Sequence, residues 1–212
     1  MLIEIFSDIV CPWCYIGKRS LDAALATPAG EGVEVIWRPY QLYPTMPVEG
    51  IDRLTFLRAR FGDGAQAAHI PENIAAEAQA VGLHFDFAAI KTTPNTFLAH
   101  RLMDIAFASG HQQALAEVLF RYYFCEGKNI GDLEVLLSAA VDVGLERVAV
   151  SELLESDLGC EEVRQQLTRA ADIGVTGVPC YLLAEKFAIP GAQSSDTLSQ
   201  LIDRVKNRLA TA

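Results

Sequence analysis

Two cysteines separated by two residues are the part of this chain best suited to chemistry. Cys11 and Cys14 enclose Pro12 and Trp13, just after a short apolar run. This spacing lets two sulfur atoms meet across one turn of a helix and form a disulfide that can be broken again. The pair therefore predicts a dithiol–disulfide redox centre.

The order of the two cysteines predicts their roles. Cys11 stands where a helix is expected to begin, and unpaired N–H groups with the positive end of the helix dipole stabilise a thiolate there. We therefore expect Cys11 to be the more exposed and to attack a substrate disulfide. Cys14, one turn further and more buried, would resolve the mixed disulfide. Pro12 suits the first helical turn because it lacks an N–H, and Trp13 would offer the substrate a flat surface.

A cysteine pair of this kind could also be half of a zinc site, or two inert buried thiols. Zinc needs about four ligands, and no second pair with this spacing exists. The histidines are scattered, at His69, His84, His100 and His111. We expect no metal. The three other cysteines, Cys125, Cys160 and Cys180, are isolated, and we expect Cys180 to be a small buried residue.

A second candidate lies far along the chain. In Gly177-Val178-Pro179 a proline stands just before an apolar run, a place where a cis peptide bond is plausible. Beside the cysteines, Pro179 would shield the sulfurs from metal and leave the backbone of Val178 free to pair with an extended substrate. Asp8, three residues before Cys11, could relay a proton, although a role as a turn or cap residue is equally compatible with its position.

Composition limits the protein's class and partners. The chain has 212 residues, a net charge of −10 and 51% hydrophobic residues. This is typical of a globular protein with a sizeable core, and it lacks the basic patch of a nucleic-acid binder. No apolar run reaches the ~20 residues of a membrane span, and Met1 leads directly into a strand-like run without a secretory leader. We expect a cytoplasmic protein with no membrane partner. The sequence predicts no oligomeric state.

The elements that position these residues follow from apolar spacing. Strands are expected over 2–7 and 33–39, with a helix from Cys11 to about Ala26 between them, which makes a β-α-β unit. Seven helical segments follow: 53–61, 71–82, 94–109, 111–125, 132–143, 147–155 and 160–173, punctuated by glycines that include Gly62-Asp63-Gly64. No strand signal interrupts them. We expect the chain to close with two strands joined across Ala184-Glu185 and a helix over 195–209, capped by Ser194 or Ser195.

This order predicts an α/β fold of thioredoxin-like architecture, with a mixed four-stranded sheet and a large all-helical insertion. Residues 1–43 and 174–212 would form the thioredoxin-like domain. Residues 44–173 would form the inserted helical domain.

Several motifs together resemble a known family. Phe6-Ser7-Asp8, Cys11-Pro12-Trp13-Cys14-Tyr15, Gly17, Trp37-Arg38-Pro39-Tyr40-Gln41-Leu42, Gly177-Val178-Pro179 and Gly191-Ala192-Gln193 are similar to the FrnE-type branch of the DsbA family of thioredoxin-fold oxidoreductases. The resemblance covers nearly the whole chain. It implies thiol–disulfide oxidoreductase or isomerase activity, with a nucleophile at Cys11, a resolving cysteine at Cys14 and a cis-proline at Pro179.

The resemblance also implies partners and marks departures. No bound cofactor is expected. Protein or small-molecule thiols and disulfides would be substrates, with glutathione as a potential co-substrate and glutathione or a thioredoxin system as electron source. Many relatives carry a buried acid six residues before the first cysteine, where this chain has Ile5. Nothing after Cys180 matches the additional cysteine pair of some FrnE-type members.

Two other functions stay open at this point. A sister group shares the fold: the 2-hydroxychromene-2-carboxylate isomerases and kappa-class glutathione transferases, which use glutathione and carry serine where Cys11 stands. The third alternative is a chaperone-like binding module in which the thiols are incidental.

Overall fold

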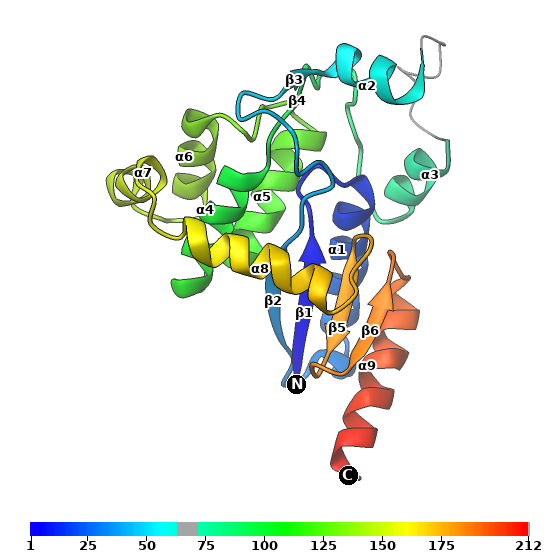
Figure 1. The fold of residues 1–212 in the computed structure, drawn as a ribbon. Helices are drawn as coiled ribbons and strands as arrows, with labels where there is room; N and C mark the ends of the chain where they lie inside the picture. The colour runs from blue at the N-terminus through cyan, green and yellow to red at the C-terminus, as the bar shows by residue number, and fades with distance from the viewer. Residues whose placement is uncertain (63–71, 212) are drawn as a thin grey trace.

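A mixed four-stranded sheet forms the centre of the molecule (Figure 1). The computed structural model describes residues 1–62 and 72–211. The strands lie in the order β2-β1-β5-β6, with β1 parallel to β2 and antiparallel to β5. Their bounds are Leu2–Ser7 (β1), Glu34–Pro39 (β2), Cys180–Leu183 (β5) and Phe187–Pro190 (β6). The expected α/β fold with a mixed four-stranded sheet is confirmed.

Helices cover both faces of this sheet, and α1 (Pro12–Leu25) and α9 (Ser195–Ala210) lie side by side on one of them (Figure 1). Ser194 caps α9 by accepting a hydrogen bond from the N–H of Thr197, as one of the two expected caps. The opposite face carries α8 (Cys160–Asp172), which packs against a small core that includes Phe6. Because side chains alternate along a strand, the two faces of β1 have separate surroundings.

In the described residues of the long segment between the two halves of the sheet, seven helices are present. They are α2 (Arg53–Phe61), α3 (Glu72–Ala80), α4 (Phe97–Ala108), α5 (Gln112–Phe124), α6 (Leu133–Asp142), α7 (Arg147–Glu155) and α8. Each matches an expected segment with its ends moved by no more than about three residues, the usual uncertainty of helix ends. The first residue of the expected 71–82 helix, the Asp63-Gly64 turn and His69 lie outside the described residues.

Two short strands were missed in this segment. β3 (Ile51–Asp52) pairs with β4 (Thr92–Thr93) in a small antiparallel sheet. The expectation that no strand interrupts the helices is therefore wrong. Two residues are too few to show an alternating pattern, so periodicity cannot reveal such a strand.

The terminal hairpin differs slightly from its prediction. β6 begins at Phe187, and Lys186 donates its N–H to the carbonyl of Leu183, so that three residues form the connection. Ala184 and Glu185 have φ values of 51° and 59°. Non-glycine residues rarely adopt these values, so this backbone conformation was not predictable for Ala184-Glu185.

One hydrophobic core cluster extends from the sheet into the inserted helices. It includes Ile5 of β1, Tyr15 of α1, and Phe120 of α5. The division into a domain of 1–43 plus 174–212 and an insertion of 44–173 stays a prediction. Among the described residues, no helix is long and apolar enough to cross a bilayer.

Candidate active site

Cys11 occupies the residue position immediately before α1. Its backbone is extended (φ −93°, ψ 113°), and Pro12 takes the first helical position. The carbonyl of Cys11 accepts the first helical hydrogen bond, from the N–H of Cys14 at 3.1 Å. The proline favours a helix start here because its missing N–H has no partner to lose. Cys11 thus lies at the positive end of the helix dipole.

The loop that ends in Pro179 lies against this cysteine. The Cys11 thiol donates to the carbonyl oxygen of Val178, with Sγ and O 3.6 Å apart. The peptide bond between Val178 and Pro179 is cis, the geometry considered from the sequence. Pro179 is buried and Val178 half-buried. Segments 167 residues apart in the chain therefore meet at one sulfur atom.

The two cysteines differ less in exposure than expected. Cys11 is 4% exposed and Cys14 is 1% exposed. Cys11 is therefore the more exposed of the two, as expected, but it is also buried, because the Val178 loop lies against its sulfur. Pro12 and Trp13 are half-buried, and Trp13 packs partly against the main core.

Cys14 is held as a thiol by its surroundings. Burial raises the pKa of Cys14 well above its usual value, and the adjacent Cys11 raises it further. The Ser7 side chain and the backbone N–H of Asp8 act in the opposite direction on that pKa, because both can donate to the sulfur. All five cysteines are free thiols in this structure, so the site is described in its reduced form.

Asp8 lies close to the cysteines in the chain, but its carboxylate has other neighbours. Oδ2 accepts a hydrogen bond from the N–H of Leu42 at 2.8 Å. Oδ1 lies 3.4 Å from Nε2 of His100, which is also 2.9 Å from the carbonyl oxygen of Tyr40. Asp8 is 1% exposed. Its backbone carbonyl accepts from the N–H of Cys11 at 3.0 Å, so the residue shapes the turn before α1, while its proton-relay role stays a prediction.

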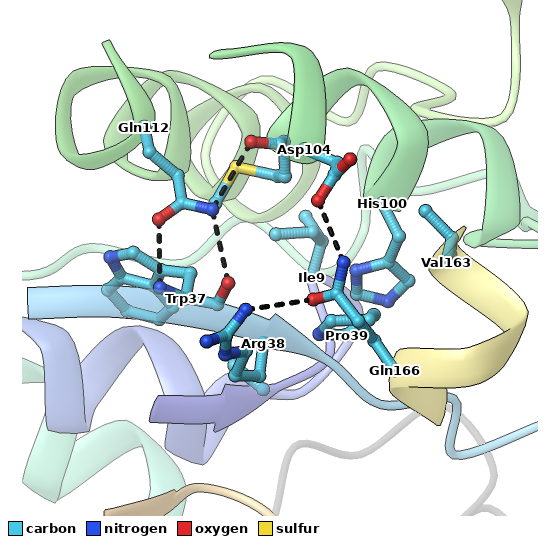
Figure 2. Close-up of a pocket in the computed structure, with 11 residues that line it drawn as sticks. Ile9, Trp37, Arg38, Pro39, His100, Asp104, Gln112, Val163 and Gln166 are labelled. Carbon is cyan, nitrogen blue, oxygen red and sulfur yellow. Dashed lines mark hydrogen bonds between the residues drawn. The ribbon is translucent and has the colours of Figure 1, made fainter. Parts of the chain in front are cut away.

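A small cavity lies next to this region, against the edge of β2 (Figure 2). Its volume is about 10 Å³, the room that one water molecule needs. Ser7 and His100 are among its lining residues. Figure 2 shows the side chain of Gln112 bonding both the N–H (2.8 Å) and the carbonyl (3.1 Å) of Trp37, which covers the edge of the strand. The cavity is too small for an organic substrate.

The other three cysteines lie in other parts of the fold and form no pair with Cys11 or Cys14. Cys180 is buried on the α8 face of the sheet, as a small core residue, and burial raises the pKa of its thiol. Cys160 is buried at the first position of α8, and Cys125 follows α5 half-buried. Across the described parts of the chain, no group of three metal-binding side chains stands together.

Sequence reasoning missed two hydroxyl groups near the cysteines. Ser7 belongs to one of the motifs that resemble the DsbA family, and Tyr181 lies in the first of the two expected closing strands. Both side chains are buried, at 2% and 1% exposure. The sequence feature that could have pointed to them is a residue with a hydroxyl group in each of two otherwise mostly apolar strands.

Comparison with known proteins places this chain in a family. The DsbA-like thioredoxin domain matches residues 2–203. A solved structure, described as a probable DsbA oxidoreductase from Streptomyces coelicolor, is 34% identical, covers 98% of this chain and 90% of its own, and superposes with a TM-score of 0.87. The chain belongs to the DsbA-like thioredoxin domain family. This DsbA-like protein is thus a member of the thiol–disulfide oxidoreductases.

Two more distant structures share the fold of this DsbA-like chain. The cytosolic disulfide reductase DsbM from Pseudomonas aeruginosa, solved with glutathione, is 20% identical and covers 99% of this chain and all of its own, with a TM-score of 0.69. A 2-hydroxychromene-2-carboxylate isomerase is 19% identical and covers 99% of this chain and 96% of its own, with a TM-score of 0.70. At these identities the likeness concerns the fold alone.

Proposed function

We propose that Cys11 and Cys14 are the redox pair of this oxidoreductase. The observation that carries the proposal is the Cys11 sulfur at the start of α1, 3.6 Å from the carbonyl oxygen of Val178. A sulfur at a helix N-terminus is favoured as a thiolate. A substrate chain that approaches Cys11 passes the Val178–Pro179 backbone on one side and Pro12 and Trp13 on the other.

The reaction takes two exchanges. The Cys11 thiolate attacks one sulfur of a substrate disulfide, forms a mixed disulfide, and releases the other substrate sulfur as a thiolate. Cys14 then loses its proton and attacks Cys11 Sγ, so that the Cys11–Cys14 disulfide forms and the second substrate thiolate leaves. The enzyme dithiol is oxidised by two electrons and the substrate disulfide is reduced. In the reverse direction a substrate dithiol is oxidised.

The substrates, the electron source and the cellular compartment are further parts of the proposed function. We infer protein or small-molecule thiols and disulfides as substrates, with glutathione or a thioredoxin system returning electrons. The cytosolic disulfide reductase DsbM, solved with glutathione, supports this choice through its shared fold. The motif set Ser7-Asp8, Cys11 to Cys14 and Gly177 to Pro179 supports the FrnE-type branch. The fold shared with the cytosolic reductase DsbM supports a cytoplasmic location.

The alternative is a glutathione-dependent isomerase or transferase, related to 2-hydroxychromene-2-carboxylate isomerase and the kappa-class glutathione transferases. The fold shared with 2-hydroxychromene-2-carboxylate isomerase supports this alternative function. A cysteine at position 11 and a second at 14 favour thiol exchange instead. A chaperone-like module would need neither sulfur.

The first prediction tests the redox pair with insulin reduction by dithiothreitol. We expect Cys11→Ser to reduce the rate to that of dithiothreitol alone, because no nucleophile remains. Cys14→Ser should accumulate a covalent mixed disulfide, because the resolving thiol is lost; mass spectrometry measures it. Cys125→Ser, which removes a half-buried thiol outside the pair, is the matched control and should retain the full rate.

Other outcomes discriminate among the functions. Full activity in both Cys11→Ser and Cys14→Ser would refute the redox pair. Glutathione-dependent turnover of a hydroxychromene carboxylate would favour the isomerase, and suppression of aggregation by a Cys11→Ser/Cys14→Ser double variant would favour the chaperone. A redox titration of the pair then gives the direction: a potential of about −270 mV is typical of a reductase and about −120 mV of a strong oxidant.

A further inference from the structure

The resolving step poses a problem that the cysteine pair does not solve by itself. If Cys14 resolves the mixed disulfide, as the proposed function requires, it must ionise while 1% exposed. Burial raises its pKa. Many relatives carry a buried acid where this chain has Ile5, whose side chain has no ionisable group. Some other group must stabilise the Cys14 thiolate.

Ser7 lies on the correct face of the sheet to do so. Side chains alternate along β1, so Ile3, Ile5 and Ser7 share the face on which Ile3 and Ile5 join the same core as Cys14. The Ser7 hydroxyl is buried and has no hydrogen-bond partner in the part of the chain that the structure describes. It is near enough to lower the pKa of Cys14 as a side-chain donor. A free donor therefore lies beside the resolving sulfur.

Tyr181 brings a second hydroxyl to the same place from the next strand. It pairs directly with Ile5 across the β1–β5 ladder, so both side chains point to the α1 face. A Cβ placed on Gly17 would lie 2.3 Å from the Tyr181 oxygen and 3.2 Å from Pro179 Cγ. Since a Cβ on a helix leans toward the N-terminus, that oxygen lies toward the turn that carries Cys14.

The Tyr181 hydroxyl is also an unused donor. Its oxygen is buried and has no hydrogen-bond partner among the described residues. Burial, followed by the charges of Cys14, Cys11 and Cys180, raises the pKa of Tyr181. The phenol therefore keeps its proton at neutral pH and can donate a hydrogen bond. An orphaned buried hydroxyl costs free energy, which a nearby thiolate would offset.

We propose that the hydroxyls of Ser7 and Tyr181 donate hydrogen bonds to the Cys14 sulfur as it becomes a thiolate, in place of the buried acid. Ser7 lies at the end of β1, two residues beyond Ile5, and Tyr181 lies opposite Ile5 on β5. The Cys14 proton leaves to solvent, both hydroxyls keep their own protons, and the thiolate then attacks Cys11 Sγ. The two residues act by stabilising the nucleophile, and no electron passes through them.

The other ionisable neighbours cannot replace them. Cys11, immediately before α1, is bonded to the substrate sulfur in the mixed disulfide and has no ionisable group at this step. Asp8, in the turn before α1, reaches the sulfur only through its backbone N–H, while its carboxylate lies against Leu42 and His100. Cys180 of β5 lies on the other face of the sheet.

The second prediction tests the pair of hydroxyls with Ser7→Ala and Tyr181→Phe, which remove one oxygen each. We expect each to slow resolution of a preformed mixed disulfide at pH 7 about tenfold, and to raise the pKa of the Cys14 thiol by about one unit. Stopped-flow release of a thiol from the mixed disulfide, measured from pH 5 to 10, gives the rate. Labelled-cysteine NMR of Cys14 in the Cys11→Ser background gives the titration without any turnover.

Matched controls separate a general loss of stability from this effect. Ser20→Ala and Tyr122→Phe remove buried hydroxyls elsewhere, on α1 and α5, and should leave both readouts unchanged. An unchanged Cys14 titration in both Ser7→Ala and Tyr181→Phe overturns the inference, as does a shift produced only by Asp8→Asn. Failure of the redox pair itself appears instead as full activity in Cys14→Ser, and the titration still tests the hydroxyls in that case.

Discussion

At the scale of single residues, Glu4 shows why an acid in β1 does not serve the cysteines. It is 1% exposed and receives hydrogen bonds from Arg38 Nε at 2.6 Å and from Arg169 at 2.8 Å to each carboxylate oxygen. It is adjacent to Ile5, so it points to the opposite, α8 side of the sheet. Burial alone would raise its pKa, but the two arginines outweigh this and leave the pKa of Glu4 lowered.

The third prediction concerns the stability that this carboxylate supplies. Glu4→Gln should reduce the free energy of unfolding by about 3 kcal/mol at pH 7, because it leaves two arginines without their counter-charge. Since the folded-state pKa of Glu4 lies below the unfolded one, its contribution is present above the unfolded value, near 4.5, and is lost as the pH falls through the folded value. Urea unfolding between pH 3 and 7 measures both effects.

The control for this residue is an exposed carboxylate on the neighbouring strand. Glu34→Gln in β2 makes the same chemical change at an exposed position, and should alter stability by less than about 0.5 kcal/mol. If Glu4→Gln unfolds at pH 7 with the same free energy as the wild-type protein, the Glu4 carboxylate does not stabilise the fold through Arg38 and Arg169.

At the scale of elements, α1 and β5 approach so closely that one position admits only glycine. Gly17 lies within α1, where alanine would favour the helix by about 1 kcal/mol. The Tyr181 hydroxyl occupies the space of its Cβ, at 2.3 Å, whereas the ring carbon Cζ is 3.6 Å away. The packing of the Tyr181 hydroxyl of β5 against α1 therefore explains why position 17 is a glycine.

The fourth prediction follows from this contact. Gly17→Ala should destabilise the protein by about 2 kcal/mol, because the new methyl group overlaps the hydroxyl. In a Tyr181→Phe background the same change should cost almost nothing, since only ordinary contact with the ring and a 3.2 Å approach to Pro179 Cγ remain. A double-mutant cycle of thermal unfolding measures the difference. Additive effects of the two changes would contradict the contact.

The helices and sheet strands were predictable from sequence because each carries its own periodicity. Cys11 and the Pro179 loop were predictable as partners because a thioredoxin-like order brings them together. The two-residue strands β3 and β4 carry no periodicity, and the hairpin at Ala184 uses a backbone conformation that its residues rarely adopt. Tyr181 was not predictable as a neighbour of Cys14, because only the β1–β5 register sets it opposite Ile5.

At the scale of the whole molecule, aromatic packing joins the sheet half to the inserted helices. The ring of Tyr15 on α1 stacks on Phe120 of α5, with centroids 5.0 Å apart and planes 8° from parallel. Phe120 also meets Trp37 of β2 edge-on at 6.0 Å. The Tyr15 hydroxyl donates to Glu117 at 2.7 Å. Local sequence patterns predicted an insertion, but they contain no information on whether its core is continuous with that of the sheet.

The fifth prediction uses this continuity. Phe120→Ala should destabilise the protein by about 3–5 kcal/mol, because the Phe120 ring on α5 is fully buried against Tyr15 of α1 and Trp37 of β2. Both tryptophans, Trp13 and Trp37, lie in residues 1–43, whereas most helical residues lie in 44–173. Tryptophan fluorescence and far-ultraviolet circular dichroism therefore report on different parts of the chain during urea unfolding. Both midpoints should fall together, since one core unfolds as a unit.

The control for this change is Phe107→Ala on α4, whose ring is 46% exposed and whose loss should move either midpoint only slightly. If Phe120→Ala shifts the dichroism midpoint and leaves that of the fluorescence in place, the insertion unfolds on its own and the continuous core does not act as one unit. Coincident shifts would instead mean that a helix far along the chain stabilises the strand and helix that carry Cys11 and Cys14. The helical insertion would then be a structural requirement for the redox pair.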